Sequence, residues 1–307
     1  MALINVKNDV VKSKLLVDRF IVPPFSVLDT KQGYWRDRVN LWKSIGIKSE
    51  MGRKDSLTFN LWLTEYNSGK SSDQKSSIFD PVLCELCYKW FSRNGDRVID
   101  PFAGGSVRGI VSSVCGRYYT GIDLSSIQIN FNIDQFEKIK KTYSHKFLPI
   151  NWVNSDSLKW TKENLENKYD FMLTCPPYFN LEVYSDLPED LSNIGDYEDF
   201  LRSYSSILTN CVEMLENNSF AVIVVGNVRD NKTGEYFDLV GDTCRIMMNA
   251  GMKYYNEMIL VNAAGTLPIR APLQFNSSRK IGKQHQNVLV FYKGDTKIIK
   301  DKFGEFE

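Results

Sequence analysis

The feature that most constrains the fold is a regular alternation of strands and helices that begins at residue 96. Two short apolar runs, 96–102 and 118–124, read as buried strands, and a small-residue stretch with helical character lies between them. The rhythm continues with a helix, a strand with its loop, a second helix and another strand, at 125–143, 147–157, 157–168 and 169–178. Such alternation predicts a doubly wound, mostly parallel sheet with right-handed crossovers.

The C-terminal part continues this pattern and then changes it. We expect two further helices, at 197–216 and 237–250. We also expect three further strands, at 219–228, 254–262 and 285–294. Because the last two strands are close in sequence, they are expected to form an antiparallel pair at one edge. The chain as a whole therefore predicts an α/β fold with a seven-stranded Rossmann-like sheet and an antiparallel edge hairpin.

The first 70 residues do not share the alternation. The stretch FIVPPFSVLDTKQGYWRDRVNLWKSIG carries Trp35 and Trp42 among basic residues, and 65–77 is rich in Ser, Lys and Gly. We predict that residues 1–70 are an N-terminal extension packed on the core, with a flexible segment at its end, and that residues 71–307 form the main domain.

The charge balance excludes a strongly basic or acidic protein. Lys and Arg total 38 against 37 for Asp and Glu, so the net charge is +1 and any surface for a charged polymer must be a local patch. No apolar run approaches the roughly 20 residues of a membrane span, and the N-terminus lacks the apolar core of a signal peptide. These features predict a cytoplasmic protein.

Cys84 and Cys87 have the two-residue spacer of a metal or redox pair, but they lie in the helical-looking stretch DPVLCELCYKWF. There is no second pair, and only two histidines, His145 and His285, are present to complete a site. We therefore predict that both cysteines are buried helix residues and that the protein has no metal site.

The stretch VIDPFAGGSVRG, 98–109, is a strand followed by a turn of small residues that opens a helix. Gly104 and Gly105 allow the backbone to approach a ligand where a β-carbon would collide, and Asp123 ends the next strand, where an acid can accept both hydroxyls of a ribose. The turn lacks the spacing of dinucleotide and phosphate-loop motifs, which argues against NAD and ATP. The class of ligand that is left is a nucleoside without a polyphosphate. An example is S-adenosylmethionine, whose adenine can lie against Phe102.

Asp156, in VNSDSL, comes at the end of the third strand. It can accept a hydrogen bond from an adenine amino group, and it can equally be the N-cap of the helix that follows. The sequence leaves both interpretations open.

The stretch LTCPPYFN, 173–180, must end the strand that precedes it. Neither proline has an N–H to donate, and both have a fixed φ angle, so the pair cannot continue a strand or lie inside a helix. A rigid turn then presents Cys175 and Tyr178 at the carboxyl end of a strand, which is where open α/β sheets bind ligands.

Taken together and in this order, DPFAGG, GIDLS, NSDS and TCPPY resemble the amino-methyltransferases of DNA, which methylate adenine N6 or cytosine N4. The resemblance covers 80–294, and TCPPY is its most specific part, because the family carries Asp, Asn or Ser there, followed by Pro-Pro and an aromatic residue. The segment SSIFDPVLCEL resembles the one that closes the methionine end of the family's cofactor pocket. The chain as a whole is similar to phage or prophage modification methylases. This resemblance implies that the protein acts in the cytoplasm of a bacterial cell.

The resemblance implies a methyltransferase sheet and a site for S-adenosylmethionine. The implied cofactor residues are Phe79, Asp100, Pro101, Phe102, Ala103, Gly104, Gly105, Asp123, Leu124, Asp156 and Ser157. It also implies that a target base is flipped out of duplex DNA, stacked on Tyr178 and held by its amino hydrogens. The implied catalytic residues are Cys175, Pro176, Pro177 and Tyr178, with the Pro176 carbonyl and Cys175 as the two acceptors.

Cys175 departs from the family pattern, since a thiol is a weaker acceptor than a carboxylate or a hydroxyl. Serine is typical of the cytosine-N4 enzymes, and cysteine is closer to serine than to aspartate, which favours cytosine N4. Two alternatives remain for Cys175: a nucleophile on cytosine C6, although the cytosine-5 enzymes lack the Pro-Pro-Tyr continuation, or an inert turn residue. For the whole chain, the alternatives are methylation of RNA or of a modified phage base, transfer of another group, or a non-catalytic nucleic-acid-binding relative.

Basic residues gather in RAPLQFNSSRKIGKQHQ, 270–286, which reads as a long loop. Arg270, Arg279, Lys280 and Lys283 are therefore candidate DNA contacts, with a solvated surface loop as the alternative. The N-terminal segment around Trp35, Arg36 and Arg38 is a second candidate, unless its tryptophans only pack the extension onto the core. The acidic loop 179–197 is expected to cover the site, and a homodimer is left open.

Overall fold

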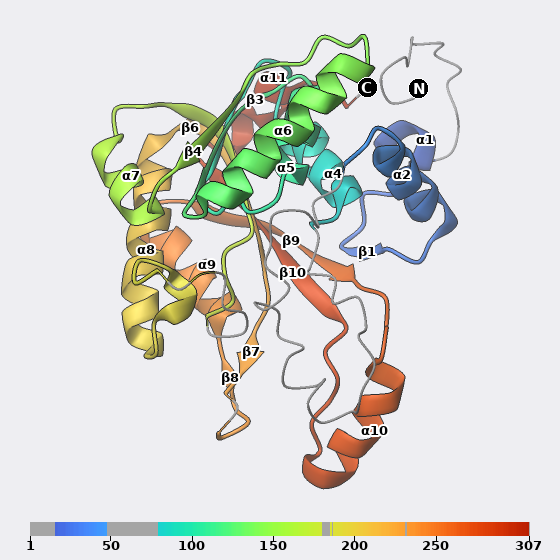
Figure 1. The fold of residues 1–307 in the computed structure, drawn as a ribbon, viewed down its shortest axis with the longest axis vertical. Helices are drawn as coiled ribbons and strands as arrows, with labels where there is room; N and C mark the ends of the chain where they lie inside the picture. The colour runs from blue at the N-terminus through green and yellow to red at the C-terminus, as the bar shows by residue number, and fades with distance from the viewer. Residues whose placement is uncertain (1–15, 48–78, 180–184, 186, 231, 307) are drawn as a thin grey trace.

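The computed structural model describes residues 16–47, 79–179, 185, 187–230 and 232–306, and its centre is one mixed sheet (Figure 1). The strand order is β1-β9-β10-β6-β5-β2-β3-β4. The strands are β1 Val27–Asp29, β2 Arg97–Asp100, β3 Tyr118–Asp123, β4 Ile150–Asn154, β5 Tyr169–Thr174, β6 Leu215–Val225, β9 Lys253–Val261 and β10 His285–Lys293. A separate short hairpin joins β7 Val228–Arg229 to β8 Tyr236–Phe237.

The predicted doubly wound, mostly parallel sheet is confirmed. Strands β4, β3, β2, β5 and β6 are parallel neighbours, and the chain moves outward from β2 to β4 before it returns to β5 on the other side of β2. The point where the order reverses, between β2 and β5, is where sheets of this kind bind ligands.

The antiparallel pair of the last two strands is also confirmed, but it does not form the edge. Strand β10 runs antiparallel to both β6 and β9, and β1 adds to the far side of β9 in parallel. Within the described residues the sheet therefore has eight strands instead of the predicted seven. The additional strand was missed because three residues are too short for a periodic signal.

Helices cover both faces of the sheet, so the central strands are buried on both sides. Alternate residues of β6 show this, since Phe220, Val222 and Val224 belong to one apolar cluster and the residues between them to the other. One face carries α2 Gly33–Ser44, α4 Pro81–Phe91 and α5 Val107–Val114, and the other carries α7 Ser157–Glu163, α8 Tyr197–Met214 and α9 Leu239–Asn249. The remaining helices are α1 Leu16–Phe20, α6 Ser126–Thr142, α10 Leu267–Ser278 and α11 Ile299–Phe303.

The described part of the N-terminal extension is attached to α4 by polar contacts of buried aromatic residues. The indole of Trp35 donates to Asp80 Oδ2 at 2.9 Å, and that of Trp42 donates to Glu85 Oε2 at 2.8 Å. Arg38 forms an ion pair with the same Glu85, which is only 2% exposed. The tryptophans therefore pack the extension onto the core, which is the alternative that the sequence left open. The predicted boundary at residue 70 and the flexible segment 65–77 lie outside the described residues.

Cys84 and Cys87 are buried in α4, as predicted. In the described part of the chain, no three His, Cys, Asp or Glu side chains are grouped so as to hold a metal ion. None of the helices described has both the length and the apolar character needed to cross a membrane.

Candidate active site

The predicted cofactor turns and the predicted catalytic turn lie at one edge of the sheet. Parallel strands end at the same edge, so the segments that follow β2, β3 and β5 are neighbours there. Because β10 is antiparallel to its neighbours, it begins where they end. The start of β10 therefore lies at this edge, together with the glycine turn and the Cys175–Tyr178 turn.

The glycine turn is held in place by β3 and α6. Gly104 has a φ of +53°, a left-handed conformation that glycine adopts without steric cost. Its N–H donates to Asp123 Oδ2 at 2.8 Å, and its carbonyl accepts from Asn132 Nδ2 of α6 at 2.8 Å. The turn is thus fixed on both sides of the glycine, which leaves its backbone in one defined position.

Asp100, the last residue of β2, is fully buried and ties three strands together. Its carboxylate accepts from Tyr119 of β3 at 2.6 Å, from Thr174 of β5 at 2.7 Å and from the backbone N–H of Phe102 at 3.1 Å. It also forms an ion pair with Arg108 at 2.5 Å. The side chain therefore lies in the protein interior, where it positions the turn, whereas the resemblance implied a place beside a cofactor.

Arg108 was not identified from the sequence, although it organises the glycine turn. Its Nη2 donates to the carbonyls of Phe102 and Ala103, and its guanidinium lies 4.6 Å from the ring centroid of Phe79. Burial opposes the charge, but the Asp100 carboxylate outweighs it, so the pKa of Arg108 is raised. The only sequence signal is a charged residue in an otherwise small and apolar stretch.

Asp123 and Asp156 lie at the ends of neighbouring strands and have different surroundings. Asp123 is half-buried, and its Oδ1 accepts from the N–H of Ser125 at 2.8 Å. Asp156 is the N-cap of α7, with contacts of 3.0 Å from Leu158 N and 3.3 Å from Lys159 N, so the capping alternative is confirmed. Asp123 thus holds the backbone of two turns, at Gly104 and at Ser125, whereas Asp156 holds the start of α7.

The remaining cofactor candidates lie on these same turns. Pro101 and Ala103 are buried, whereas Phe102, Gly105 and Leu124 are half-buried. Ser157 donates from its Oγ to the carbonyl of Pro101, which joins the start of α7 to the glycine turn. Phe79 is half-buried beside Arg108.

The TCPPY turn follows β5 as predicted and places its aromatic ring at the site. Cys175 and Tyr178 are half-buried, and the thiol sulfur lies 3.8 Å from the Tyr178 hydroxyl oxygen. Gln286, near the start of β10, donates from Nε2 to that hydroxyl at 2.8 Å. This contact was not predicted, since the two residues are 108 positions apart.

Phe179 anchors the end of this turn in the core. It is 2% exposed, and its ring centroid lies 5.1–5.4 Å from those of Tyr197, Phe200 and Phe237. Its φ is +51°, which is rare for a bulky residue and persists only where the surrounding packing enforces it. The aromatic cluster therefore holds the backbone directly after Tyr178.

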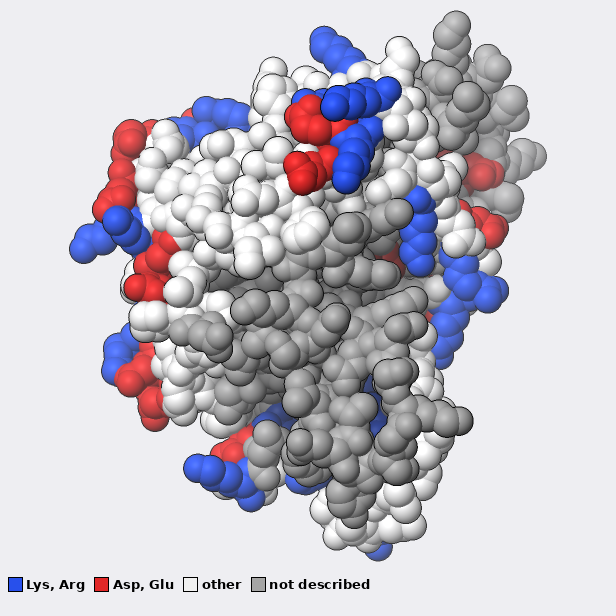
Figure 2. Space-filling view, viewed as in Figure 1, with Lys and Arg blue, Asp and Glu red and all other residues white. Residues whose placement is uncertain are grey.

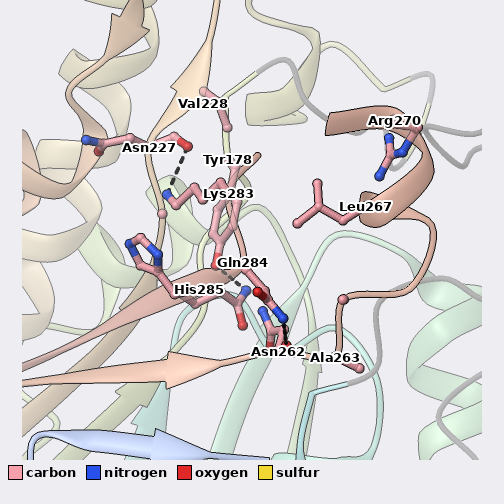
Figure 3. Close-up of a pocket in the computed structure, with 13 residues that line it drawn as sticks. Tyr178, Asn227, Val228, Asn262, Ala263, Leu267, Arg270, Lys283, Gln284 and His285 are labelled. Carbon is pink, nitrogen blue, oxygen red and sulfur yellow. Dashed lines mark hydrogen bonds between the residues drawn. The ribbon is translucent and has the colours of Figure 1, made fainter. Parts of the chain in front are cut away.

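A cavity of about 310 Å³ opens beside Tyr178 (Figure 3). Its walls come from the ends of β6 and β9, from α10 and from the start of β10: Tyr178, Gly226, Asn227, Val228, Asn262, Ala263, Ala264, Leu267, Arg270, Lys283, Gln284, His285 and Gln286. Lys283 Nζ donates to the carbonyl of Asn227 at 3.1 Å, and burial lowers the pKa of Lys283 to about 8.

The structure separates the four predicted DNA contacts. Arg270 and Lys283 line the cavity, whereas Arg279 is exposed at the end of α10 and Lys280 lies against Gly234, next to the β7–β8 hairpin. The predicted long loop is wrong in part, because 267–278 form α10, which projects from the body in Figure 1. Residues 258–294 contain no acid, and no red atoms lie over α10 at the bottom of Figure 2, where the described surface is mostly white.

The acidic loop 179–197, expected to cover the site, falls partly outside the described residues. Its described part contains a short helical turn, Leu191–Asn193, which Asp190 caps.

Comparisons with known proteins find similarity in structure alone. No family model matches the chain, and no curated protein matches its sequence. TrmN from Thermus thermophilus is similar with a TM-score of 0.45 and 14% identity over 70% of this chain and 49% of that one. A second Thermus thermophilus protein, assigned as a DNA modification methylase, gives a TM-score of 0.35 and 20% identity over 46% of this chain and 52% of that one.

A third similar structure is magnesium protoporphyrin IX methyltransferase from Synechocystis PCC 6803, which was solved with bound S-adenosylmethionine. Its TM-score is 0.44, with 11% identity over 77% of this chain and 91% of that one. The present chain spans about half the length of the two Thermus proteins.

Proposed function

We propose that this chain transfers a methyl group from S-adenosylmethionine to the exocyclic amino group of a flipped base in DNA. The observation that carries the proposal is the position of the Cys175–Tyr178 turn. It follows β5, with the glycine turn and Asp123 on one side and a cavity on the other. Such an arrangement suits a cofactor and a second ligand that meet at the turn.

The cofactor side fits a nucleoside without a polyphosphate. Gly104 leaves room for close approach of a ligand, and the half-buried Asp123 carboxylate lies at the end of β3, the position where an acid can accept ribose hydroxyls. Phe102 offers a half-buried ring to the adenine, and Asp156 lies at the end of the adjacent strand. When bound, S-adenosylmethionine supplies a methyl group on a positively charged sulfur.

The other side of the turn suits a planar base with an amino group. The lone pair of an exocyclic amino nitrogen is delocalised into the ring, so the nitrogen attacks well only when its hydrogens are held out of that plane. The Pro176 carbonyl and Cys175 would accept those hydrogens, and Tyr178 would stack on the base. Gln286 fixes the Tyr178 hydroxyl and so sets the orientation of the ring.

Cys175 favours cytosine N4 as the target. Its thiol replaces the acceptor that the resembling enzymes carry and is closest in size and charge to serine. On the DNA side, Arg270, Arg279, Lys280 and Lys283 are the candidate contacts, and they come from a segment without acidic residues.

The proposal is tested by transfer of labelled methyl groups from S-adenosylmethionine to unmodified duplex DNA. The parent should label DNA, and Tyr178→Ala should lose the activity. Tyr118→Ala is the matched control, because Tyr118 is 43% exposed at the start of β3, at the opposite edge of the sheet. Cofactor binding without labelling of any DNA would contradict the proposal, and labelling of RNA alone would redirect it.

A further inference from the structure

The described charged side chains that line the cavity beside Tyr178 all have the same sign. Its described lining contains Arg270, Lys283 and His285 and no Asp or Glu. The three residues come from α10, from the segment that follows it and from the start of β10. Since the whole chain is almost neutral, this cavity is a local site of positive charge.

Lys283 is placed in the cavity by a glycine. A β-carbon at Gly226 would lie 2.8 Å from Lys283 Nζ and 3.8 Å from Tyr178 Cε2, so the absence of a side chain there leaves room for the ammonium beside the tyrosine ring. The ammonium has three N–H donors, and among the described residues one of them has an acceptor, the carbonyl of Asn227. No carboxylate of the described residues forms an ion pair with it.

Arg270 has unused hydrogen-bonding capacity on the α10 side of the cavity (Figure 3). Its Nε is buried and has no hydrogen-bond partner among the described residues. A buried N–H without an acceptor costs free energy, and a bound ligand that supplies an acceptor would remove that cost.

We propose that this cavity binds the phosphodiester backbone next to the flipped nucleotide, with Lys283 and Arg270 as donors to phosphate oxygens while Tyr178 stacks on the base. The inference rests on the proposed function and adds a second contact to it. Hydrogen bonds from cations to phosphate are strong, and partial burial strengthens them further. A contact of this kind positions the strand and carries no sequence information.

The test is the salt dependence of binding, measured by fluorescence anisotropy with a labelled mixed-sequence duplex. Loss of one phosphate contact lowers the slope of log affinity against log salt by about 0.9. Between 50 and 200 mM salt, the parent should therefore lose about 3.5-fold more affinity than either Lys283→Gln or Arg270→Gln. Lys283→Arg keeps the charge and should keep the slope.

Lys293→Gln is the matched control. Lys293 also donates to backbone carbonyls, of Val212 and Leu215, and burial also lowers its pKa, but it lies at the opposite end of β10. Its substitution should leave the slope unchanged. Slopes for Lys283→Gln and Arg270→Gln equal to the parent's would overturn the inference, even if overall affinity fell, because a structural defect does not change the number of phosphates contacted.

The pH dependence provides a second readout. The charged and titratable residues lining the cavity are Lys283, Arg270, His285 and Tyr178. Burial lowers the pKa of Lys283 to about 8 in the free protein, so its positive charge is present below that pH and lost above it. Parent affinity should fall between about pH 7.5 and 9.5, and Lys283→Arg should not show that fall; identical profiles would contradict the assignment.

These binding measurements are independent of methyl transfer. A reduced slope in variants of a parent that transfers no methyl group would support the phosphate site while the proposed reaction fails. Methyl transfer with unchanged slopes would leave the reaction standing and overturn the phosphate site. Binding of an RNA duplex of the same sequence, with none of the DNA, would overturn the assignment to DNA.

Discussion

Replacing Arg108 by methionine should destabilise the protein strongly, because it breaks a buried ion pair. Arg108 is 5% exposed and Asp100 is fully buried, with 2.5 Å between Arg108 Nε and Asp100 Oδ2. Methionine can fill the space but has no donor, so the Asp100 carboxylate would keep only neutral partners. Removing one member of such a pair costs about 3–5 kcal/mol. That is a large fraction of the roughly 5–15 kcal/mol that stabilises a typical protein.

Urea denaturation followed by circular dichroism measures this loss, with Arg97→Met as the control. Arg97 pairs with Asp170 at 2.9 Å, but its side chain is 47% exposed, so its substitution should cost no more than about 1 kcal/mol. Adding Asp100→Asn to Arg108→Met should recover part of the loss, since it removes the uncompensated charge. Equal losses for Arg108→Met and Arg97→Met would refute this reasoning.

Three further predictions concern the turns of the site. Phe179→Ala should cost about 3–5 kcal/mol of unfolding free energy in the same urea experiment, because it empties the centre of an aromatic cluster; a cost below about 1 kcal/mol would show that the cluster does not hold the turn. Gln286→Leu should lower kcat/KM for methyl transfer by about 2- to 13-fold, the value of one hydrogen bond to Tyr178, with the thermal midpoint little changed. An unchanged kcat/KM would remove Gln286 from the site. Gly104→Ala should cost about 1–2 kcal/mol, since alanine is strained at a φ of +53°, and should weaken cofactor binding in calorimetry; unchanged affinity would mean that the turn does not contact the cofactor.

The sheet could be predicted from the sequence because its strands are buried on both faces and alternate with amphipathic helices. This pattern indicated the order of elements from 96 onward, and the structure contains each of them. Among the elements that gave no such signal are β1 and α10. Strand β1 has three residues, and α10 contains Pro268 and Pro272, of which the first lies where no N–H is needed and the second costs one hydrogen bond.

The sequence showed which strand ends form the site, but it did not show which side chains contact each other there. A residue at the carboxyl end of a parallel strand lies at the edge of the sheet where ligands bind. Its position in the sequence does not show which way its side chain points. Asp100 therefore looked like a cofactor contact, although it is fully buried among protein donors. Gln286 was missed because its contact with Tyr178 spans 108 residues, and the conformation of Phe179 depends on packing that no local pattern reveals.

The most direct test of the central claim is the chemical identity of the product. After reaction of the protein with unmodified duplex DNA and S-adenosylmethionine, the DNA would be digested to nucleosides and analysed by mass spectrometry. The geometry of the Cys175–Tyr178 turn predicts a methyl group on an amino nitrogen, with N4-methylcytosine favoured over N6-methyladenine. Formation of 5-methylcytosine, or of no methylated nucleoside despite cofactor binding, would contradict it.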